Sequence, residues 1–372
     1  MQLHVVSFDV PWPADYGGVI DVYNRLQALN EKGVKVILHT FYYGRQPAEE
    51  LREICAEVHY YKRKSRFWSL FSQQPMILRS RRSKKLLKAL LQDKHAILFE
   101  GQHTTDLLKH PKLKARRKLV RIHNIEHEYY KELSTSTKNW FKKIYFLWES
   151  RKLKKDEPLL KEADQLLCIT EKDTAYYDRL FGNACFLPVA LKCYKGEAVL
   201  STEVPFCLYH GNLSVSENQN AVKWLLEHIF KPMEERSFII AGRKPPVWLK
   251  NQISSATNVK LIENPSNEQM NRLIHSATAH TLVTNQSTGI KIKLLNALCS
   301  EAPVFCNSAM VVGTGLENLC EVHDDANDYK DALIRFLQHP NTDHFQKRKE
   351  LMSTFGFPQH VQIILEHLKR VE

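Results

Sequence analysis

Short apolar segments that alternate with helical patterns constrain the fold of this chain more than any other feature of the sequence. LHVVSF (3–8), AILFE (96–100) and SFIIAG (237–242) are almost continuously apolar, as are strands buried on both faces of a parallel sheet. Between such segments, apolar residues recur at helical spacing, for example from Val222 to Phe230. The pattern predicts an α/β protein whose parallel sheets are covered by helices on both faces.

The alternation weakens once, in the segment 186–204, and this break indicates a linker. A chain of 372 residues is long enough to bury two separate cores. We therefore expect two doubly wound, Rossmann-like domains that face a cleft, the N-terminal one at residues 1–190 and the C-terminal one at residues 205–357. The cleft between them is the expected ligand site.

The excess of positive charge lies entirely in the first half of the chain. The formal net charge is +12, and residues 1–190 contain 34 Lys and Arg against 22 Asp and Glu. An asymmetry of this kind indicates an anionic partner for the first domain, which is nucleic acid, an acidic membrane surface or a charged substrate.

Ten of these basic residues lie in the segment 62–88, which contains no acidic residue. Aromatic residues such as Phe67 are interleaved with them, and the segment 138–148 repeats the combination. Basic residues with interleaved aromatics are typical of surfaces that bind anionic membranes or single-stranded nucleic acid, although most charge runs are solvated faces. We expect an anionic membrane surface and no nucleic acid. The expected membrane contacts are Lys62, Arg63, Lys64, Arg66, Trp68, Arg79, Arg81 and Arg82.

The sequence predicts a cytoplasmic protein, with peripheral attachment to the inner face of the membrane as a further expectation. No segment approaches the roughly 20 apolar residues of a membrane-spanning helix. Asp9, Pro11 and Pro13 interrupt any apolar core of a signal peptide. The eight cysteines show no C-x-x-C spacing, and several, such as Cys168, lie in apolar segments, which is typical of buried thiols in a reducing compartment.

Glycines and cations follow several of the expected strands. A glycine between a strand and a helix lets the backbone approach a ligand, and a helix N-terminus favours an anion, although a tight turn is the alternative. Cations in a first helical turn oppose the helix dipole unless an anion is bound there. The candidate phosphate-binding residues on this argument are Gly17, Gly18, Arg243, Lys244, Thr288, Gly289, Ile290, Lys291 and Lys293.

His123 closes a strongly β-rich segment and begins the sequence HNIEH, which matches the inverted zinc-peptidase pattern H-x-x-E-H. That pattern needs both histidines one turn apart on a helix. Because Asn124 is typical of a loop or a helix N-cap, we expect His123 and His127 to diverge, and we predict no metal. A residue at the carboxyl tip of a parallel strand faces the ligand site, so His123 is the candidate catalytic residue, with a structural role as the alternative.

Taken together, these features resemble glycosyltransferases of the two-domain GT-B fold, and in particular glycosyltransferase family 4 (glycosyl transferases group 1). The resemblance covers nearly the whole chain. It is carried by the GG pair at 17–18, EGQH (100–103), HNIEHEYY (123–130), ITEKD (169–173), HGNLSVSENQNAVKWL (210–225), IIAGRKP (239–245) and TGIKIKLLNALCSEAPVFCN (288–307).

The resemblance implies a retaining glycosyltransferase that moves a sugar from a nucleotide-diphosphate donor to a glycan or lipid-linked acceptor in the synthesis of a surface polysaccharide or glycolipid. It implies a donor site in the second domain near Gly289, an acceptor on the first domain, and a C-terminal helix (358–372) that packs back on the first domain. It implies no metal or other cofactor. It also implies contact of His123 with the transferred sugar and adds Gly211 and Asn296 to the donor-binding candidates.

The sequence departs from the family pattern at the donor-binding positions. The two glutamates that the pattern places eight residues apart are Thr288 and Asn296 here, and its Arg and Lys after the glycine at 211 correspond to Asn212 and, approximately, to Glu217. The cations that remain to replace them are Arg243, Lys244, Lys291 and Lys293. Two alternatives stay open, a non-catalytic homologue that acts as a binding or scaffold protein and a nucleic-acid-binding protein.

Overall fold

The computed structural model divides the chain into two compact units. The first comprises residues 1–190 and 355–372, and the second comprises residues 191–354. The structure describes residues 1–14, 17–64, 72–137, 139–191, 204–287, 291–300, 302–340 and 353–369. The candidates that lie outside the described residues are Arg66, Trp68, Thr288, Gly289 and Ile290.

The first unit is built on a parallel sheet whose described strands number seven and follow the order β3-β2-β1-β4-β5-β6-β7. The strands are β1 (Gln2–Ser7), β2 (Lys35–Tyr42), β3 (Glu57–Lys62), β4 (Ala96–Glu100), β5 (Lys118–Ile122), β6 (Gln165–Cys168) and β7 (Ala184–Phe186). The helical elements are α1 (Gly17–Glu31), η1 (Glu49–Glu53), α2 (Met76–Arg79), α3 (Lys84–Leu90), η3 (Gln102–Leu107), η4 (Pro111–Leu113), α4 (Glu126–Ser136), α5 (Trp140–Asp156), η5 (Glu157–Glu162), α6 (Glu171–Phe181) and α14 (Phe357–Lys369).

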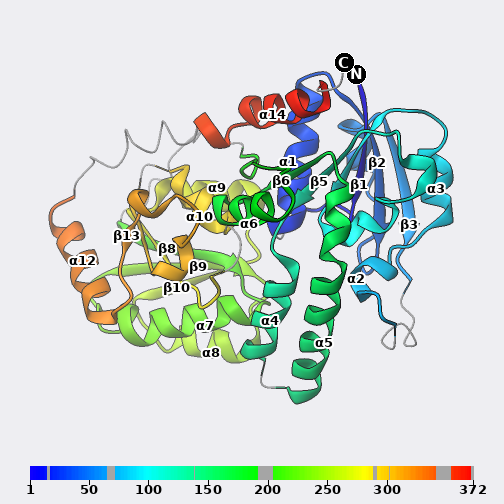
Figure 1. Ribbon diagram of the computed structural model, residues 1–372. Coiled ribbons are helices and arrows are strands. Elements are labelled where there is room, and N and C mark those ends of the chain that lie inside the picture. Colours follow the sequence, from blue (N-terminus) through cyan, green and yellow to red (C-terminus); the bar gives the residue numbers. More distant parts are fainter. Residues whose placement is uncertain are drawn as a thin grey trace. The chain divides into compact units, whose positions relative to one another are not determined.

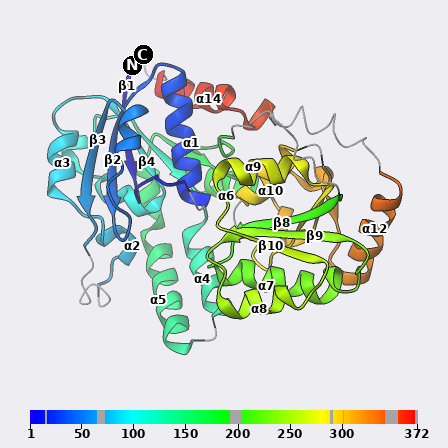
Figure 2. The ribbon, with the colours of Figure 1, turned by 180° about the vertical axis from the view of Figure 1, so that it is seen from behind.

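Helices cover both faces of this sheet, because successive residues of a strand point to opposite sides. In β1, Leu3 and Val5 belong to the core that includes Leu26 of α1 and Val361 of α14, whereas Val6 belongs to the core under α3 and η3. Helices α1 and α14 lie side by side in both views (Figures 1 and 2). The C-terminal helix is therefore part of the first unit.

The second unit contains a parallel sheet whose described strands number six, in the order β10-β9-β8-β11-β12-β13. The strands are β8 (Phe206–Asn212), β9 (Ser237–Arg243), β10 (Val259–Glu263), β11 (Ala279–Leu282), β12 (Val304–Cys306) and β13 (Glu321–Val322). The helical elements are α7 (Ser216–Leu225), the π-helical turn η6 (Leu226–Phe230), α8 (Val247–Ser254), α9 (Asn267–Ser276), α10 (Ile292–Leu298), α11 (Ser308–Val311), η7 (Glu317–Leu319) and α12 (Ala326–Gln338).

The second sheet is also covered on both faces. Helix α9 packs on one face, where Leu273 contacts the core around Phe206. Helices α7 and α8 lie on the face opposite α9 and α10 (Figures 1 and 2). Strands β8 and β9 approach closely at Gly211 and Gly242, since a Cβ on Gly242 would lie 2.1 Å from the carbonyl oxygen of Gly211. Two doubly wound parallel sheets confirm the predicted α/β fold class.

Two expectations about the environment of the chain can be compared with the structure. The free cysteines among the described residues are Cys55, Cys168, Cys185, Cys207, Cys306 and Cys320. Cys299 is disulfide-bonded, so the expectation of thiols throughout the chain was wrong at that position. Among the described residues, no helix combines the length and the apolar character needed to cross a bilayer.

Candidate functional site

The carboxyl end of the first sheet brings together charged residues that are distant in the sequence. Glu100 ends β4, Arg121 lies near the end of β5, and His123 directly follows β5. Asp21 and Arg25 lie one turn apart on α1. Strand order reverses between β1 and β4, and this switch point is where open α/β sheets bind their ligands. All of these side chains except that of His123 are almost completely buried.

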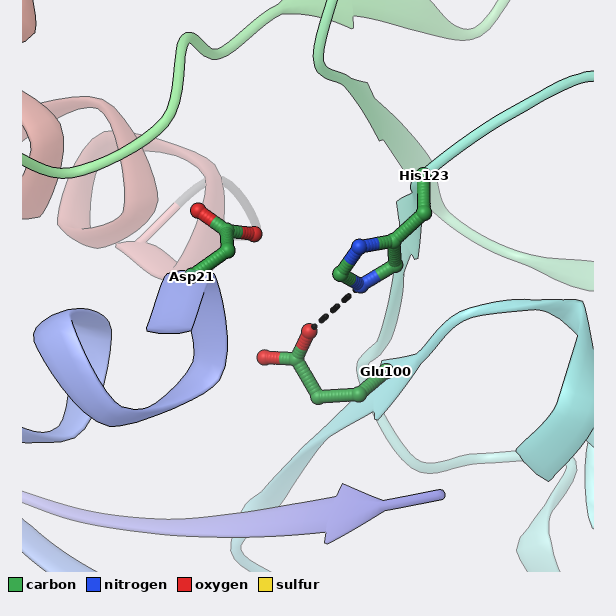
Figure 3. A group of neighbouring side chains, drawn as sticks. All are labelled: Asp21, Glu100 and His123. Carbon is green, nitrogen blue, oxygen red and sulfur yellow. Dashed lines mark hydrogen bonds and ion pairs between the residues drawn. The ribbon is translucent and has the colours of Figure 1, made fainter. Parts of the chain in front are cut away.

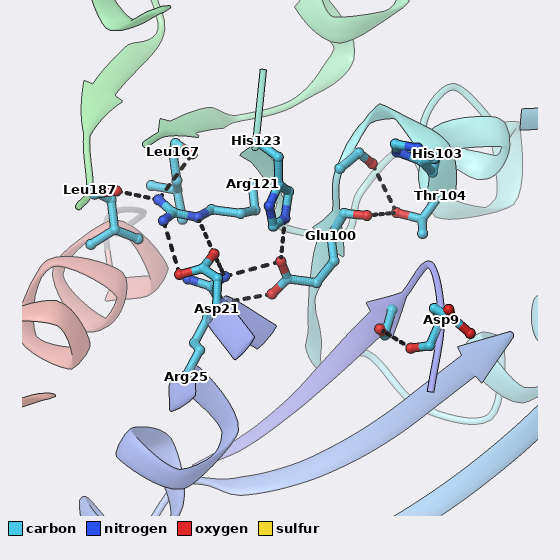
Figure 4. Close-up of polar contacts among 12 residues, drawn as sticks. Asp9, Asp21, Arg25, Glu100, His103, Thr104, Arg121, His123, Leu167 and Leu187 are labelled. Carbon is cyan, nitrogen blue, oxygen red and sulfur yellow. Dashed lines mark hydrogen bonds and ion pairs between the residues drawn. The ribbon is translucent and has the colours of Figure 1, made fainter. Parts of the chain in front are cut away.

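Arg25 is the centre of an ion-pair network in this group (Figure 4). Its Nε donates to Oε1 of Glu100 at 2.7 Å, and its Nη2 donates to Oδ2 of Asp21 at 2.5 Å. Nε of Arg121 donates to the same oxygen of Asp21 at 3.1 Å. Two buried carboxylates are thus balanced by two buried guanidinium groups, which is the arrangement that buried charges require.

Two histidines extend the network. Nδ1 of His360, on α14, lies 2.9 Å from the carbonyl oxygen of Pro188, and its Nε2 lies 2.9 Å from Nη1 of Arg25. A carbonyl oxygen only accepts, so Nδ1 carries the proton and Nε2 accepts from the guanidinium. Nε2 of His123 lies 3.3 Å from Oε2 of Glu100. An ionised carboxylate only accepts, so Nε2 of His123 donates to Glu100.

Burial alone would raise the pKa of both carboxyl groups, but the neighbouring cations outweigh it. Arg121 and Arg25 hold the pKa of Asp21 far below its usual range. Arg25, together with His123, lowers the pKa of Glu100. Burial lowers the pKa of His360 well below its usual value, and the two arginines lower it further. At neutral pH, both carboxyl groups are therefore ionised and His360 is neutral.

Asp21, Glu100 and His123 also satisfy the spacing of a metal site (Figure 3). One ligand atom from each lies within 4.8 Å of the others, and no other such group occurs in the part of the chain that the structure describes. Both carboxylates, however, are already paired with Arg25 and Arg121. A divalent cation would have to displace these buried guanidinium groups, so the donor set does not fit a metal.

The two histidines of HNIEH diverge, as the sequence predicted, because α4 begins only at Glu126. His123 lies against Glu100, whereas Nδ1 of His127 lies 3.2 Å from Oε1 of Glu157. The geometry of an inverted zinc-peptidase site is therefore not formed.

A second group of buried polar side chains lies beside His123. A Cβ on Gly101, whose φ is +72°, would meet Nδ1 of His103 at 3.0 Å and the His123 ring at 3.6 Å. The Phe8 ring centroid lies 5.3 Å from His103 and 5.4 Å from His123. Nδ1 of His103 is buried without a hydrogen-bond partner among the described residues, and it lies 3.8 Å from Oε1 of Glu126.

Glu126 and His103 are both neutral at pH 7. Burial raises the pKa of Glu126 to about 8, although Arg81 opposes the shift. Burial lowers the pKa of His103 well below its usual value, and Arg81 lowers it further. The edge of the first sheet therefore presents the ionised carboxylate of Glu100, which is hydrogen-bonded to His123. The neutral carboxyl group of Glu126 and the neutral imidazole of His103 lie next to this pair. Perturbed titratable groups that converge at a sheet edge are typical of functional sites.

The structure separates the expected membrane contacts by burial. The exposed ones are Lys62, Lys64 and Arg82, and the half-buried ones are Arg63 and Arg79. Arg81 is buried, and its Nε and Nη1 donate to the carbonyl oxygens of Phe8 and Ile77 at 2.8 Å each. The prediction of Arg81 as a membrane contact was wrong, because its guanidinium is buried within the first unit and hydrogen-bonds backbone carbonyl groups there.

In the second unit, polar residues again gather where strand order reverses, between β8 and β11. Nζ of Lys293, on α10, donates to Oδ1 of Asn218 at 2.8 Å and lies 3.4 Å from Oη of Tyr209. Burial lowers the pKa of Lys293 to about 8, while Glu217 opposes the shift and Lys291 adds to it. Lys293 is therefore a partly desolvated cation at pH 7.

His210 lies beside this cation at the end of β8. Its Nε2 is buried without a hydrogen-bond partner among the described residues. Burial, with Lys293 as a second cause, lowers the pKa of His210 to about 3, so the ring is neutral. Oγ1 of Thr284, which follows β11, donates to Oε1 of Glu217 at 2.5 Å. Polar side chains therefore gather at the switch point of the second sheet.

The remaining donor-binding candidates are placed as follows. Gly211 lies in β8, Arg243 ends β9, Lys244 follows it with φ +48°, Lys291 is the N-cap residue of α10, and Asn296 is half-buried on that helix. Helix α1 begins at Gly17, so Gly17 and Gly18 form its first turn in the first unit. The two glycines therefore lie within the helix and not, as the sequence predicted, between a strand and the helix.

Sequence reasoning missed most of the network around Arg25. Glu100 and Arg121 are single charges inside the apolar segments AILFE and KLVRIH, and such a charge is a signal that it needs a buried partner. Asp21 and Arg25 have the i, i+4 spacing of a helical ion pair. Nothing in the sequence marks His360, which reaches Arg25 across 335 residues.

The sequence of this chain is similar to those of known proteins over most of its length. Residues 204–339 match the model of the family described as glycosyl transferases group 1. A Klebsiella pneumoniae protein, named as an uncharacterized 44.6 kDa protein in the cps region, is 27% identical over 333 residues, which are 84% of each chain.

Solved structures share the fold. An α,α-trehalose-phosphate synthase (UDP-forming) from Burkholderia xenovorans in complex with glucose-6-phosphate superposes with a TM-score of 0.66 at 13% identity, covering 99% of this chain and 100% of that one. A glycosyltransferase from Rickettsia africae gives a TM-score of 0.64 at 12% identity, with 100% of both chains covered. An E. coli structure described as trehalose-6-phosphate bound with UDP-2-fluoro glucose gives 0.64 at 12%, again over 100% of both chains. At these identities the likeness shows the fold, which is GT-B.

Proposed function

We propose that this chain, whose residues 204–339 match the model of the glycosyl transferases group 1 and which has the GT-B fold, is a glycosyltransferase that moves a sugar from a nucleotide-diphosphate donor with retention of configuration. The second unit binds the donor, and the first unit binds a glycan or lipid-linked acceptor. The observation that carries this proposal is the partly desolvated cation Lys293 at the switch point of the second sheet.

Lys293 supplies a cation to a region in which this chain lacks one that the family pattern contains. The family pattern places a lysine at about the position of Glu217, on α7, and this chain has an acid there. Nζ of Lys293 comes from α10 instead and reaches Asn218, the residue that follows. We infer that Lys293 binds the diphosphate of the donor and stabilises the charge that develops as the diphosphate leaves. His210, whose buried ring feels the charge of Lys293, lies on β8 in the same unit.

The proposed donor site predicts that the protein binds a nucleoside diphosphate. We expect a saturating nucleoside diphosphate, chosen from UDP, GDP and ADP, to raise the melting temperature by about 5 °C, and we expect Lys293→Met to weaken that nucleotide's affinity about tenfold or more. The reason is that the variant loses a charge-assisted hydrogen bond to phosphate. Differential scanning fluorimetry with a nucleotide titration measures both.

Lys223→Met is the matched control, because Lys223 is an exposed lysine near the far end of α7. It should leave the nucleotide-dependent shift unchanged. The donor site is refuted if no nucleoside diphosphate or nucleotide sugar shifts the melting temperature of the wild-type protein. A nucleotide that binds but is never turned over would support the non-catalytic homologue instead.

His123 is proposed to contact the transferred sugar. Glu100 accepts from Nε2 of His123, and Arg25 holds Glu100 in place and ionised. The ring is thereby oriented, and in its neutral form Nδ1 is left to accept a hydrogen bond from a ligand hydroxyl.

We expect His123→Ala to lower the rate of transfer, or of slow donor hydrolysis, by about 100-fold or more, since a positioned hydrogen-bonding group at the reacting sugar is lost. Release of nucleoside diphosphate from a panel of nucleotide sugars measures the rate. His127→Gln is the control and should retain most activity, because His127 pairs with Glu157 instead. Equal loss in both variants would favour a joint role of the two histidines, as in a zinc site, and would contradict the proposed role.

The relative whose name places it in a cps region supports a role in surface polysaccharide synthesis. The phosphorylated sugar named with the Burkholderia structure is consistent with a sugar acceptor on this fold. We propose that the acceptor is a glycan or a lipid-linked glycan, that the protein acts in the cytoplasm at the inner face of the membrane, and that no metal or other cofactor takes part.

A further inference from the structure

One helix of the first unit exposes an unusual cluster of large apolar side chains. The exposed apolar residues of α5 are Trp140, Phe141, Ile144, Leu147 and Trp148. Trp140, Phe141 and Ile144 have exposed fractions of 61%, 66% and 56%, which are far above those of residues that serve a core. A monomeric soluble protein rarely leaves such side chains contiguous, and a patch of this kind marks an interaction surface.

The exposed apolar residues share one face of α5. At about 100° per residue, the five apolar positions fall within an arc of about 120°. The same arc, continued along the helix, carries Arg151 and Lys155, both exposed. Helix α5 thus presents aromatic and aliphatic side chains at the end that follows the turn from α4, and cations toward its other end. Figure 1 shows α4 and α5 as an antiparallel hairpin.

The opposite face of α5 holds the helix on the unit. Leu153 is buried with Ile77 and Leu78 of α2. Glu149 is completely buried, accepts from the backbone N–H of Met76 at 2.6 Å and pairs with Lys152 at 2.8 Å. The exposed face is therefore not needed for the core of the unit.

The charges that α5 itself exposes around the apolar residues are cationic. Glu149 is the only acid between residues 139 and 155, and it is buried, so α5 shows no acidic side chain to solvent from Asn139 to Lys155. Lys142 and Lys143 are exposed beside the aromatic residues.

We propose that the exposed face of α5 docks on the surface of a bilayer that contains anionic lipids. The aromatic and aliphatic residues enter the boundary between headgroups and acyl chains, where tryptophan is favoured, and the lysines contact the anionic headgroups. Single-stranded nucleic acid would use the cations and rings but gives no role to Ile144 and Leu147. A protein partner that docked on this face would need acidic residues around its own apolar surface to match the lysines of α5.

This inference rests on the proposed location at the membrane and names the face that docks there. Because vesicle binding is measured without any sugar donor, a failure to bind would leave the proposed transferase activity standing. The full-length protein is sedimented with vesicles of phosphatidylcholine and phosphatidylglycerol, and separately with vesicles of phosphatidylcholine alone. We expect binding to the anionic vesicles that weakens in high salt, and about tenfold or greater loss of binding in the double variant Trp140→Ser, Phe141→Ser. Circular dichroism verifies that the variant is folded, as its substitutions are on the surface.

The matched control is the double variant Val247→Ser, Trp248→Ser on α8, which removes an exposed Val-Trp pair from the second unit. It should bind anionic vesicles like the wild-type protein. The inference is overturned if the wild-type protein does not bind these vesicles, or if the α5 variant binds as well as the control. It is also overturned if the α5 substitutions abolish instead a self-association seen by size-exclusion chromatography or the binding of single-stranded RNA.

Discussion

Replacing Arg25 with methionine is expected to lower the free energy of unfolding by about 3–5 kcal/mol at neutral pH. The substitution removes the guanidinium that hydrogen-bonds Asp21 and Glu100, and both carboxylates stay buried. Arg121 still pairs with Asp21, so Glu100 is the carboxylate left without a guanidinium partner. Urea denaturation followed by circular dichroism measures the loss as a shift of the transition that reports the first unit.

The loss of stability caused by Arg25→Met is expected to depend on pH. The pKa of Asp21 and that of Glu100 are lowered in the folded protein, so their pairing stabilises the fold above their unfolded pKa values and is lost as the pH falls. The deficit of Arg25→Met should therefore narrow toward acidic pH, where the uncompensated carboxylate takes up a proton.

Two further variants test the network. Arg52→Met removes the exposed pair between Arg52 and Glu49 and should change stability by less than about 1 kcal/mol. Adding Glu100→Gln to Arg25→Met should restore part of the lost stability, because no uncompensated charge remains at that position. Strict additivity of the two substitutions would show that the pair is not coupled.

Glu126→Gln is expected to stabilise the protein by about 2 kcal/mol near pH 8 and to have little effect near pH 4. Burial raises the pKa of Glu126 from 4.5 to about 8, so the folded chain keeps a proton that the unfolded chain releases as the pH rises. The wild-type protein therefore loses stability between these two pH values, and glutamine, which is neutral at every pH, does not. Position N1 of α4 favours an anion and keeps the gain below the full linkage value.

Urea denaturation of the wild-type and Glu126→Gln proteins across this pH range measures the difference. Glu128→Gln, two residues further along the same helix and partly exposed, should give a small difference that does not grow with pH. A Glu126→Gln variant that is destabilised at pH 8 would mean that the carboxyl group is ionised in the folded protein and makes a favourable contact there. Stabilisation with loss of turnover would indicate that the neutral acid beside His103 serves the reaction.

The site could be anticipated from the sequence only in part. His123 and Lys293 stand directly after or near apolar strands, so local pattern placed them at the carboxyl edges of the two sheets. Their partners were not visible. Glu100 is adjacent to His123 only because β4 and β5 pair, and Asn218 meets Lys293 across 75 residues. The spacing of residues along the chain carries no record of such contacts.

The basic segments show the same division. The count of ten cations in 62–88 suggested one extended surface, yet Arg81 is buried against backbone carbonyl groups, and among the described residues α5 exposes Trp140, Phe141 and Trp148. A segment rich in basic and aromatic residues can form an exposed binding surface, or its side chains can be buried and hold the segment on the protein. The direction of each side chain distinguishes them, and packing against neighbouring elements sets that direction.

The sequence by itself determined that this chain forms two parallel, doubly wound sheets, because the periodicities of strands and helices are local properties of the chain. It also determined where the carboxyl edges of the strands lie, and hence where His123 and Lys293 stand. Only the tertiary structure decided which charges pair, which histidines are neutral, and which face of α5 is left exposed. These depend on desolvation and on distances through space, which arise only when segments hundreds of residues apart, such as Arg25 and His360, are brought into contact.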